Sequence, residues 1–164
     1  AYSFYKQSPK LELEQVNTLK AMNMMQTFIN THPGSSRIKD ATDIIDQCRQ
    51  KMEMKEFRSA QLYYNLEQYK ASAIAFANLL NNFPETQKGD AYKLMVIKSY
   101  YKYAKLSVQE KQAERFEKVI EEYQDFVDRF PDSKLLKEAE DYHNLSINQL
   151  KDKKNEQNTS SAKR

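Results

Sequence analysis

The chain has 164 residues, of which 40% are hydrophobic and 30% are charged, a balance that suits a folded domain or repeat array with a solvated surface. No apolar run approaches the ~20 residues that a transmembrane helix requires. The single cysteine, Cys48, excludes an intramolecular disulfide and a cysteine-based zinc site. With only two glycines and four prolines among many helix-forming residues, the composition predicts an all-α fold.

The net charge of +3 is concentrated at the end of the chain. Residues 151–164 contain five basic and two acidic side chains, so the preceding 150 residues carry equal numbers of each sign. A neutral body with a basic tail is not the continuous positive surface that a nucleic-acid backbone requires. We therefore expect no nucleic-acid partner. The same division of charge suggests a repeat domain over 1–150 and a polar basic tail over 151–164, which has no apolar face to bury.

Three similar eight-residue segments, here called the proline phrases, occur along the chain: FINTHPGS (28–35), LLNNFPET (79–86) and FVDRFPDS (126–133). Their prolines lie 51 and 47 residues apart, and apolar or aromatic residues precede each proline by eight, five, four and one positions, the spacing of one helix face. Proline disfavours helical geometry in the residue before it and so ends each helix. The hydroxyl residue two positions after each proline is predicted to N-cap the next helix: Ser35, Thr86 and Ser133.

Each phrase thus predicts a turn between antiparallel helices, the repeating unit of a helical solenoid. In chain order, about seven helices are expected, over 9–31, 35–54, 55–66, 69–82, 88–106, 109–130 and 133–150, with Ser8 as the N-cap of the first. Before Ser8, the segment AYSFYKQ resembles the helix end KSYYKYAK at 98–105, so the chain is expected to open inside a repeat. The alignment predicts five buried side chains: Phe76, Leu80, Phe83, Tyr123 and Phe130.

The segment 69–82, YKASAIAFANLLNN, differs from its neighbours because Lys70 is its only charged residue. A helix that is apolar on most sides is usually buried on most sides, as the second helix of a solenoid unit often is. The alternative is that its outer side meets a partner protein, because phenol rings and uncharged amides are favoured at interfaces. On that hypothesis, the partner-binding residues are those that offer such groups on this helix and its entry: Tyr64, Tyr69, Lys70, Asn78, Asn81 and Asn82.

No catalytic or metal site is recognisable in the sequence. His32 and His143 belong to different repeats, and neither has a second ligand at a metal-binding spacing. His32 stands where the sister phrases have Phe, which favours a packing role. Cys48 continues an apolar stripe at helical spacing and is expected to be buried and inert. Nothing places a nucleophile beside a histidine base, so the sequence predicts no enzyme, no metal and no cofactor.

The second unit resembles the tetratricopeptide family: Ala60, Tyr63, Phe76 and Pro84 stand at its small, tyrosine, phenylalanine and proline positions, although the repeat exceeds the standard ~34 residues. The phrases HPGSSRIKDAT, AQLYYNLEQYKAS and FPETQKGDA are similar to the later repeats of the BamD-like family, tetratricopeptide lipoproteins of the outer-membrane β-barrel assembly machine. The resemblance covers about residues 1–106. Residues 107–150 add a helical pair that shorter members of that family lack.

The resemblance implies a scaffold on the periplasmic face of the cell outer membrane, held there in the full-length lipoprotein by a lipid anchor that this soluble segment lacks. It also implies that the later repeats dock on the periplasmic POTRA region of the barrel subunit BamA, alongside other lipoproteins of the machine. Two alternatives stay open. One is an unrelated tetratricopeptide adaptor for a peptide or protein of the cell envelope, and the other is an accessory domain of a hydrolase.

Overall fold

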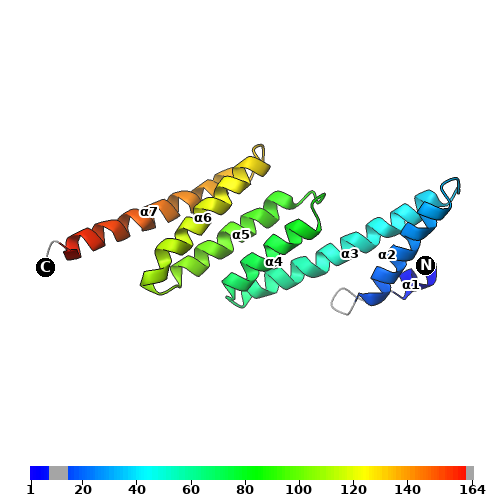
Figure 1. The fold of residues 1–164 in the computed structure, drawn as a ribbon, viewed down its shortest axis with the longest axis horizontal. Helices are drawn as coiled ribbons and strands as arrows, with labels where there is room; N and C mark the ends of the chain where they lie inside the picture. Colours follow the sequence, from blue (N-terminus) through cyan, green and yellow to red (C-terminus); the bar gives the residue numbers. More distant parts are fainter. Residues whose placement is uncertain (8–14, 162–164) are drawn as a thin grey trace. The chain divides into compact units, whose positions relative to one another are not determined.

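Seven helices make up the described part of the chain, and none of its residues forms a strand, which confirms the predicted all-α, tetratricopeptide-like fold (Figure 1). The computed structural model describes residues 1–7 and 15–161, with side chains up to Lys153. The helices are α1 (Tyr2–Lys6), α2 (Val16–Thr31), α3 (Ile38–Asn65), α4 (Tyr69–Asn82), α5 (Gly89–Lys105), α6 (Gln109–Arg129) and α7 (Leu136–Ser161).

The helix boundaries depart from the predicted ones at two places. The expected helices 35–54 and 55–66 form a single helix, α3, because no glycine or proline interrupts the segment Ile38–Asn65. The last helix, α7, continues beyond residue 150 to Ser161 and so runs into the polar tail. The expected N-cap Ser8 and the first turns of the helix predicted over 9–31 lie outside the described residues.

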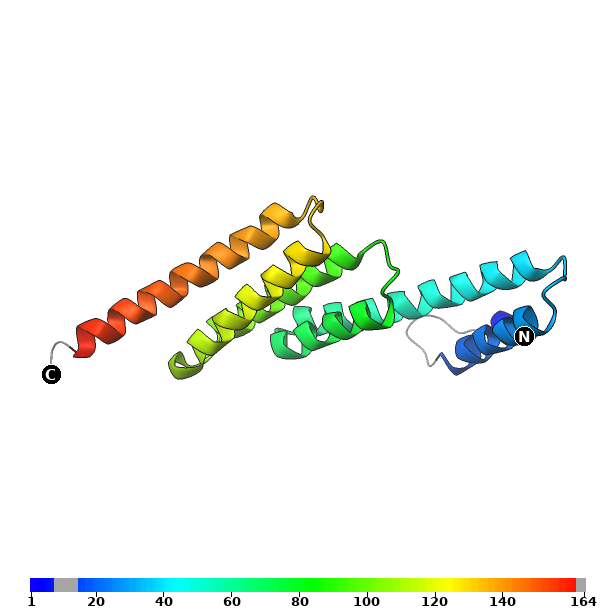
Figure 2. The same ribbon diagram turned by 45° about the horizontal axis from the view of Figure 1, so that its top comes forward.

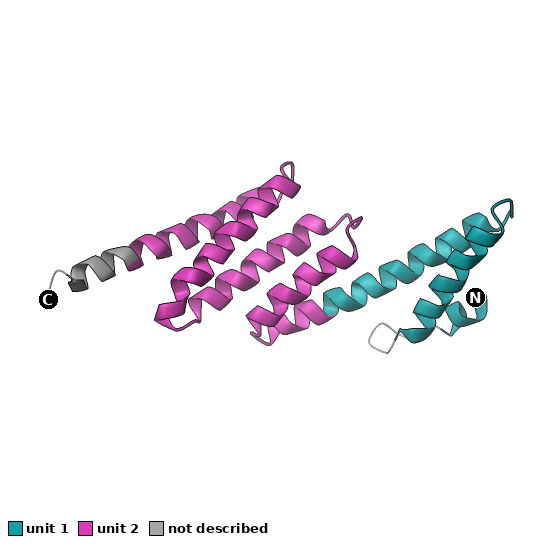
Figure 3. Ribbon diagram, viewed as in Figure 1, with its two compact units in different colours: residues 1–58 teal, residues 59–164 magenta. Residues whose placement is uncertain are grey.

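The chain forms two compact units, residues 1–58 and 59–164, and the boundary between them falls within α3 (Figure 3). In the first unit, α1 packs on α2, and apolar side chains fill the space between α2 and α3: Ala21, Met25, Ala41, Ile44 and Cys48. The Tyr5 hydroxyl donates to Gln47 Oε1 at 2.5 Å, which ties α1 to α3. Cys48 is 1% exposed, as the apolar stripe predicts.

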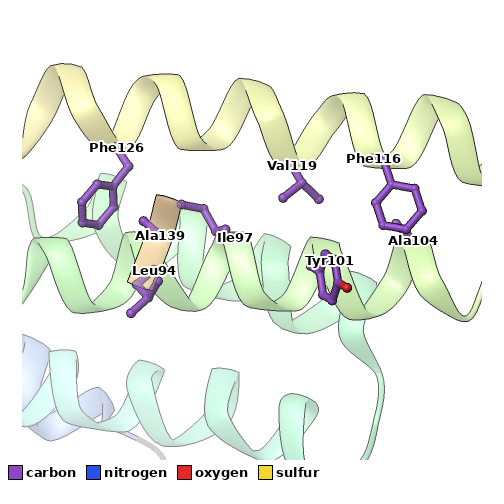
Figure 4. Packing of buried hydrophobic residues seen from close by; sticks show 8 residues of the cluster. All are labelled: Leu94, Ile97, Tyr101, Ala104, Phe116, Val119, Phe126 and Ala139. Carbon is purple, nitrogen blue, oxygen red and sulfur yellow. The ribbon is translucent and has the colours of Figure 1, made fainter. Parts of the chain in front are cut away.

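In the second unit, each helix from α4 to α7 packs against the next, and α5 also contacts α7, as in a helical solenoid (Figures 1 and 2). Hydrophobic side chains of α5, α6 and α7 form its core (Figure 4): Leu94, Ile97, Tyr101, Ala104, Phe116, Val119, Phe126 and Ala139. Serine joins α4 to both neighbours, because Ser72 Oγ donates to the Ala60 carbonyl at 3.1 Å and accepts from Ser99 Oγ at 3.2 Å. These small side chains satisfy one another's hydrogen-bonding groups where the helices pack closely.

The three proline phrases adopt one turn conformation. The residue before each proline has φ between −134° and −129° and ψ between 54° and 64°: His32, Phe83 and Phe130. Its N–H donates to the carbonyl four residues back at 2.8–3.0 Å, and its own carbonyl accepts from the N–H three residues on at 3.0–3.2 Å. The Ser or Thr hydroxyl two residues after each proline accepts from the second N–H beyond it at 3.0–3.2 Å. The alignment of the three phrases therefore corresponds to three equivalent turns.

The role predicted for these hydroxyl residues is wrong in one respect. Each helix begins three residues after its Ser or Thr, at Ile38, Gly89 and Leu136. For α5 the N-cap residue is Lys88, whose side chain makes no capping bond. The hydroxyls thus stabilise the turn that leads into the helix, and the prediction missed this extra turn because the sequence marks its start but not its length.

Of the five side chains predicted to be buried, Phe76 and Leu80 are inside, at 0% and 4% exposed. The prediction is wrong for Phe83, Tyr123 and Phe130, which are only half-buried. Phe83 and Phe130 are the C-cap residues of α4 and α6, so they lie at the proline turns where the helices end. The Tyr123 ring stacks on the His143 ring, with 4.4 Å between the ring centroids, and keeps part of its surface in contact with solvent.

A buried ammonium group joins α5 to α6. The Lys93 side chain is 6% exposed, and its Nζ pairs with Glu122 at 2.5 Å and with Asp125. Each acid has a second cation, since Lys118 lies 3.1 Å from Glu122 and Arg129 lies 3.6 Å from Asp125. Burial acts to raise the pKa of Asp125, but the bond and charge of Lys93, helped by Arg129, outweigh burial and lower that pKa below its usual 3.8.

Candidate docking surface

The turn from α3 into α4 has the hydrogen bonds of a Schellman motif. The Gln68 N–H donates to the Tyr63 carbonyl at 2.9 Å, and the Glu67 N–H donates to the Tyr64 carbonyl at 3.0 Å. Glu67 stands at the position where such a turn needs left-handed backbone, with φ at 59°, and it is the only described residue with a positive φ. Glycine usually occupies this position because it has no Cβ to clash.

Two of the predicted partner-binding residues pack on each other across this turn. The rings of Tyr64 and Tyr69 meet edge to face, with 5.3 Å between centroids and 72° between planes. Both side chains are half-buried. Burial raises the pKa of the Tyr64 phenol, and the nearby Lys98 charge offsets only part of that rise. The pair therefore forms a fixed aromatic edge at the entry to α4.

One face of α4 is open. Its exposed residues recur at the spacing of a single helix face: Lys70, Ile74, Asn78 and Asn81. Asn82, at the end of the helix, is exposed as well. The opposite face is buried through Ser72, Ala73, Phe76, Leu79 and Leu80. Burial of α4 is thus one-sided, and the predicted residues Lys70, Asn78 and Asn81 share the exposed side with Ile74, which is 46% exposed.

An open groove begins at this face, with a volume of about 430 Å³ and walls that are mostly apolar. It is lined by the α3–α4 turn, by α4 and by one residue of α5: Glu67, Gln68, Tyr69, Lys70, Ala71, Ile74 and Tyr103. The Arg115 guanidinium lies 4.1 Å from the centroid of the Tyr103 ring and also donates to Ser107 Oγ. Gln112 Nε2 donates to the carbonyls of Lys105 and Ser107 at 3.1 and 2.9 Å, which fixes the α5–α6 turn beside Tyr103.

Exposed aliphatic side chains lie on two turns at the same end of the second unit. The α3–α4 and α5–α6 turns lie at that end (Figures 1 and 2). They leave large apolar side chains in solvent, with Leu66 at 58%, Leu106 at 70% and Val108 at 65% exposed. Large apolar side chains left exposed at such turns are candidates for contact with another protein.

The predicted partner-binding residues omit five of the residues that line the groove: Glu67, Gln68, Ala71, Ile74 and Tyr103. Ile74 was detectable, because it is the one large aliphatic residue at helical spacing among Lys70, Asn78 and Asn81. Glu67 and Tyr103 carried no such signal, since the backbone of a turn and the meeting of α4 with α5 depend on the tertiary fold. The structure brings Tyr64 and Tyr69 together, whereas Asn78, Asn81 and Asn82 lie further along α4, outside the groove lining.

The residues considered for chemistry occupy separate places. His32 is exposed and stacks on Phe28 with 5.2 Å between ring centroids, and His143 stacks on Tyr123. Burial raises the pKa of the Cys48 thiol, with a smaller opposing effect from Lys51, and so disfavours the reactive thiolate. Within residues 1–7 and 15–153, no three His, Cys, Asp or Glu side chains gather as a metal site would require.

Comparison with models of protein families shows to which family the chain belongs. Residues 1–112 of the 164 match the YfiO family, which is described as an outer membrane lipoprotein. The chain belongs to this family. No curated protein matches the chain. None of the helices in the described ranges combines the length and the apolar character that crossing a membrane would take.

The YfiO match covers all the residues that line the groove. It includes the α3–α4 turn, all of α4, and Tyr103 on α5, and it ends just after α6 begins. Arg115, which stacks on Tyr103, and nearly all of the α6–α7 hairpin lie beyond the matched residues. The residues that line the groove therefore belong to the YfiO-matched part of the chain, whereas the guanidinium that packs on Tyr103 comes from a helix that lies mostly beyond it.

Proposed function

We propose that this member of the YfiO family is a non-enzymatic scaffold subunit of the outer-membrane β-barrel assembly machine. Its second unit docks on the periplasmic POTRA region of the barrel subunit BamA. Membership of an outer membrane lipoprotein family supports the location, and a stack of helical hairpins supports the scaffold role, because solenoids present long regular surfaces to other proteins. Other lipoproteins of the machine are further partners in this proposal.

The observation that carries the docking site is the open face of α4. An exposed Ile74 sits among uncharged Asn78 and Asn81, with the Tyr64–Tyr69 pair at one end. Burying this face in an interface removes apolar surface from water and desolvates few charges, since Lys70 is the one charged residue on it. We place the BamA contact on this face, with Tyr64, Tyr69, Lys70, Asn78, Asn81 and Asn82 as its contributing residues.

The test is a calorimetric titration of the chain with the POTRA region of BamA. Asn78→Glu places an unpaired charge in the interface and is expected to weaken binding about tenfold or more. Tyr69→Ala removes a large ring and is expected to have a similar effect. The matched control is Asn148→Glu, the same change at an exposed position of α7. Circular dichroism verifies that each variant keeps its helices.

Two results would overturn this proposal in different ways. Wild-type affinity for both Asn78→Glu and Tyr69→Ala would move the docking site away from α4, most naturally to the α6–α7 hairpin. No binding by the wild-type chain would instead favour an adaptor for another peptide or protein of the cell envelope.

A further inference from the structure

Glu67 has a left-handed backbone conformation, which glycine adopts more easily than glutamate does. Its φ of 59° lies in the left-handed region, where the Cβ of an ordinary residue meets the following carbonyl. The two Schellman hydrogen bonds hold it there, and glycine would make the same bonds without the clash. A strained residue at a surface turn is a reason to ask what its side chain does.

The carboxylate of Glu67 has no ion-pair partner within the described ranges. Glu67 is exposed, and neither it nor the neighbouring Lys70 takes part in an ion pair there. Elsewhere in the second unit, acids such as Glu122 and Glu138 are paired with lysine. The side chain of Glu67 therefore contributes no ion pair to the described part of the fold, although Glu67 is one of the residues that line the groove.

The groove walls suit a cation with an apolar stem. Ala71 and Ile74 offer aliphatic surface, and Tyr69 and Tyr103 offer phenol rings. The Tyr103 ring already makes a cation–π contact within the chain, since the Arg115 guanidinium lies 4.1 Å from its centroid. Arginine and lysine side chains pack their stems on apolar surface and keep their charged heads at a polar edge. Glu67 is the one acidic residue among those that line this groove.

We propose that Glu67 is a specificity-determining residue of the docking surface, and that the partner inserts an arginine or lysine side chain into the Tyr69–Tyr103 groove to meet its carboxylate. The proposal rests on the docking function proposed above and adds the chemistry of the partner residue. Lys70 stands on the α4 side of the same groove and disfavours a cation placed there. The inserted cation is therefore directed to the α3–α4 turn, and an acidic partner residue that bound Lys70 instead would give the opposite response to loss of Glu67.

The experiment uses Glu67→Gln and Glu67→Gly in calorimetric titrations against the POTRA region of BamA at low and at physiological salt. Glu67→Gln keeps the length and the strain of the side chain and removes its charge. It is expected to raise Kd about tenfold and to reduce the salt dependence of binding. The matched control is Glu117→Gln on α6, an exposed carboxylate that lies outside the groove lining and forms no ion pair within the described ranges.

Glu67→Gly separates a binding role from a structural one. Glycine relieves the left-handed strain, so the melting temperature is expected to rise by about 2–4 °C while Kd increases at least as much as in Glu67→Gln. A residue with only a structural role would not move stability and affinity in opposite directions. An unchanged or lower Kd for Glu67→Gln, with the wild type binding, overturns this inference alone. A wild-type chain that does not bind overturns the docking function and this inference with it.

Discussion

Replacing Lys93 with methionine tests whether the buried ammonium holds α5 against α6. Methionine keeps most of the volume and removes the charge that pairs with Glu122 and Asp125. Removing one partner of a buried ion pair costs about 3–5 kcal/mol. The loss is smaller here, because Glu122 keeps Lys118 at 3.1 Å and Asp125 is 47% exposed and keeps Arg129 at 3.6 Å. We expect Lys93→Met to lower the free energy of unfolding by about 2 kcal/mol.

The assay is urea unfolding followed by circular dichroism, with hydrogen exchange of α5 and α6 amides to locate the loss. The effect is expected to depend on pH in a definite direction. Because the folded-state pKa of Asp125 is lowered from 3.8, its stabilising contribution is present above about pH 4 and is lost as the pH falls through the lowered value. The difference between wild type and variant should therefore shrink in acid.

The double variant Lys93→Met, Glu122→Leu is the matched control, since replacing both members of a buried pair by apolar residues is often neutral. It should recover part of the stability lost in the single variant. The reasoning is refuted if Lys93→Met loses less than about 0.5 kcal/mol at pH 7, or if the loss is as large at pH 3 as at pH 7.

Three further predictions concern packing. Phe76→Ala should lower the free energy of unfolding by about 3–5 kcal/mol, because the ring is 0% exposed; a cost below about 1 kcal/mol in urea unfolding would contradict that burial. Gly89→Ala should destabilise by about 1 kcal/mol, because an added Cβ would lie 3.0 Å from the Phe130 ring, which also packs against Phe126; a raised melting temperature would show that the ring moves aside. Removing residues 152–164 should change stability by less than about 0.5 kcal/mol, because that sequence has no apolar face, and a clear drop in melting temperature would mean that the tail docks.

The sequence predicted the turns well because their chemistry is local. A proline, the restricted residue before it and a hydroxyl two positions later are enough to define a turn that the structure contains three times. The merged helix α3 was missed for a related reason. The predicted break at 54–55 had no glycine or proline to support it, and the helix continues through it.

The candidate site was only partly predictable, because it depends on contacts between distant segments. The low charge of α4 pointed to an unusual surface, and three of the residues chosen there share the exposed face. The half-burial of Tyr123 and the place of Tyr103 in a groove follow from α7 and α4 lying beside them, which no local pattern encodes. Glu67 resembles any other turn residue until its backbone angle is known.

The three equivalent turns have a consequence for how such a chain changes in length. The backbone bonds of each turn run between its own residues, so its conformation does not depend on which helices it joins. A hairpin gained or lost at one of these prolines leaves the neighbouring turn intact, and the number of hairpins becomes a property that evolution can vary. The turn at Pro131 has an additional link, because Ser133 Oγ also donates to Asp90 Oδ2 at 2.6 Å. That bond fastens the turn of the α6–α7 hairpin, which lies almost entirely beyond the YfiO-matched residues, to the first turn of α5 within them.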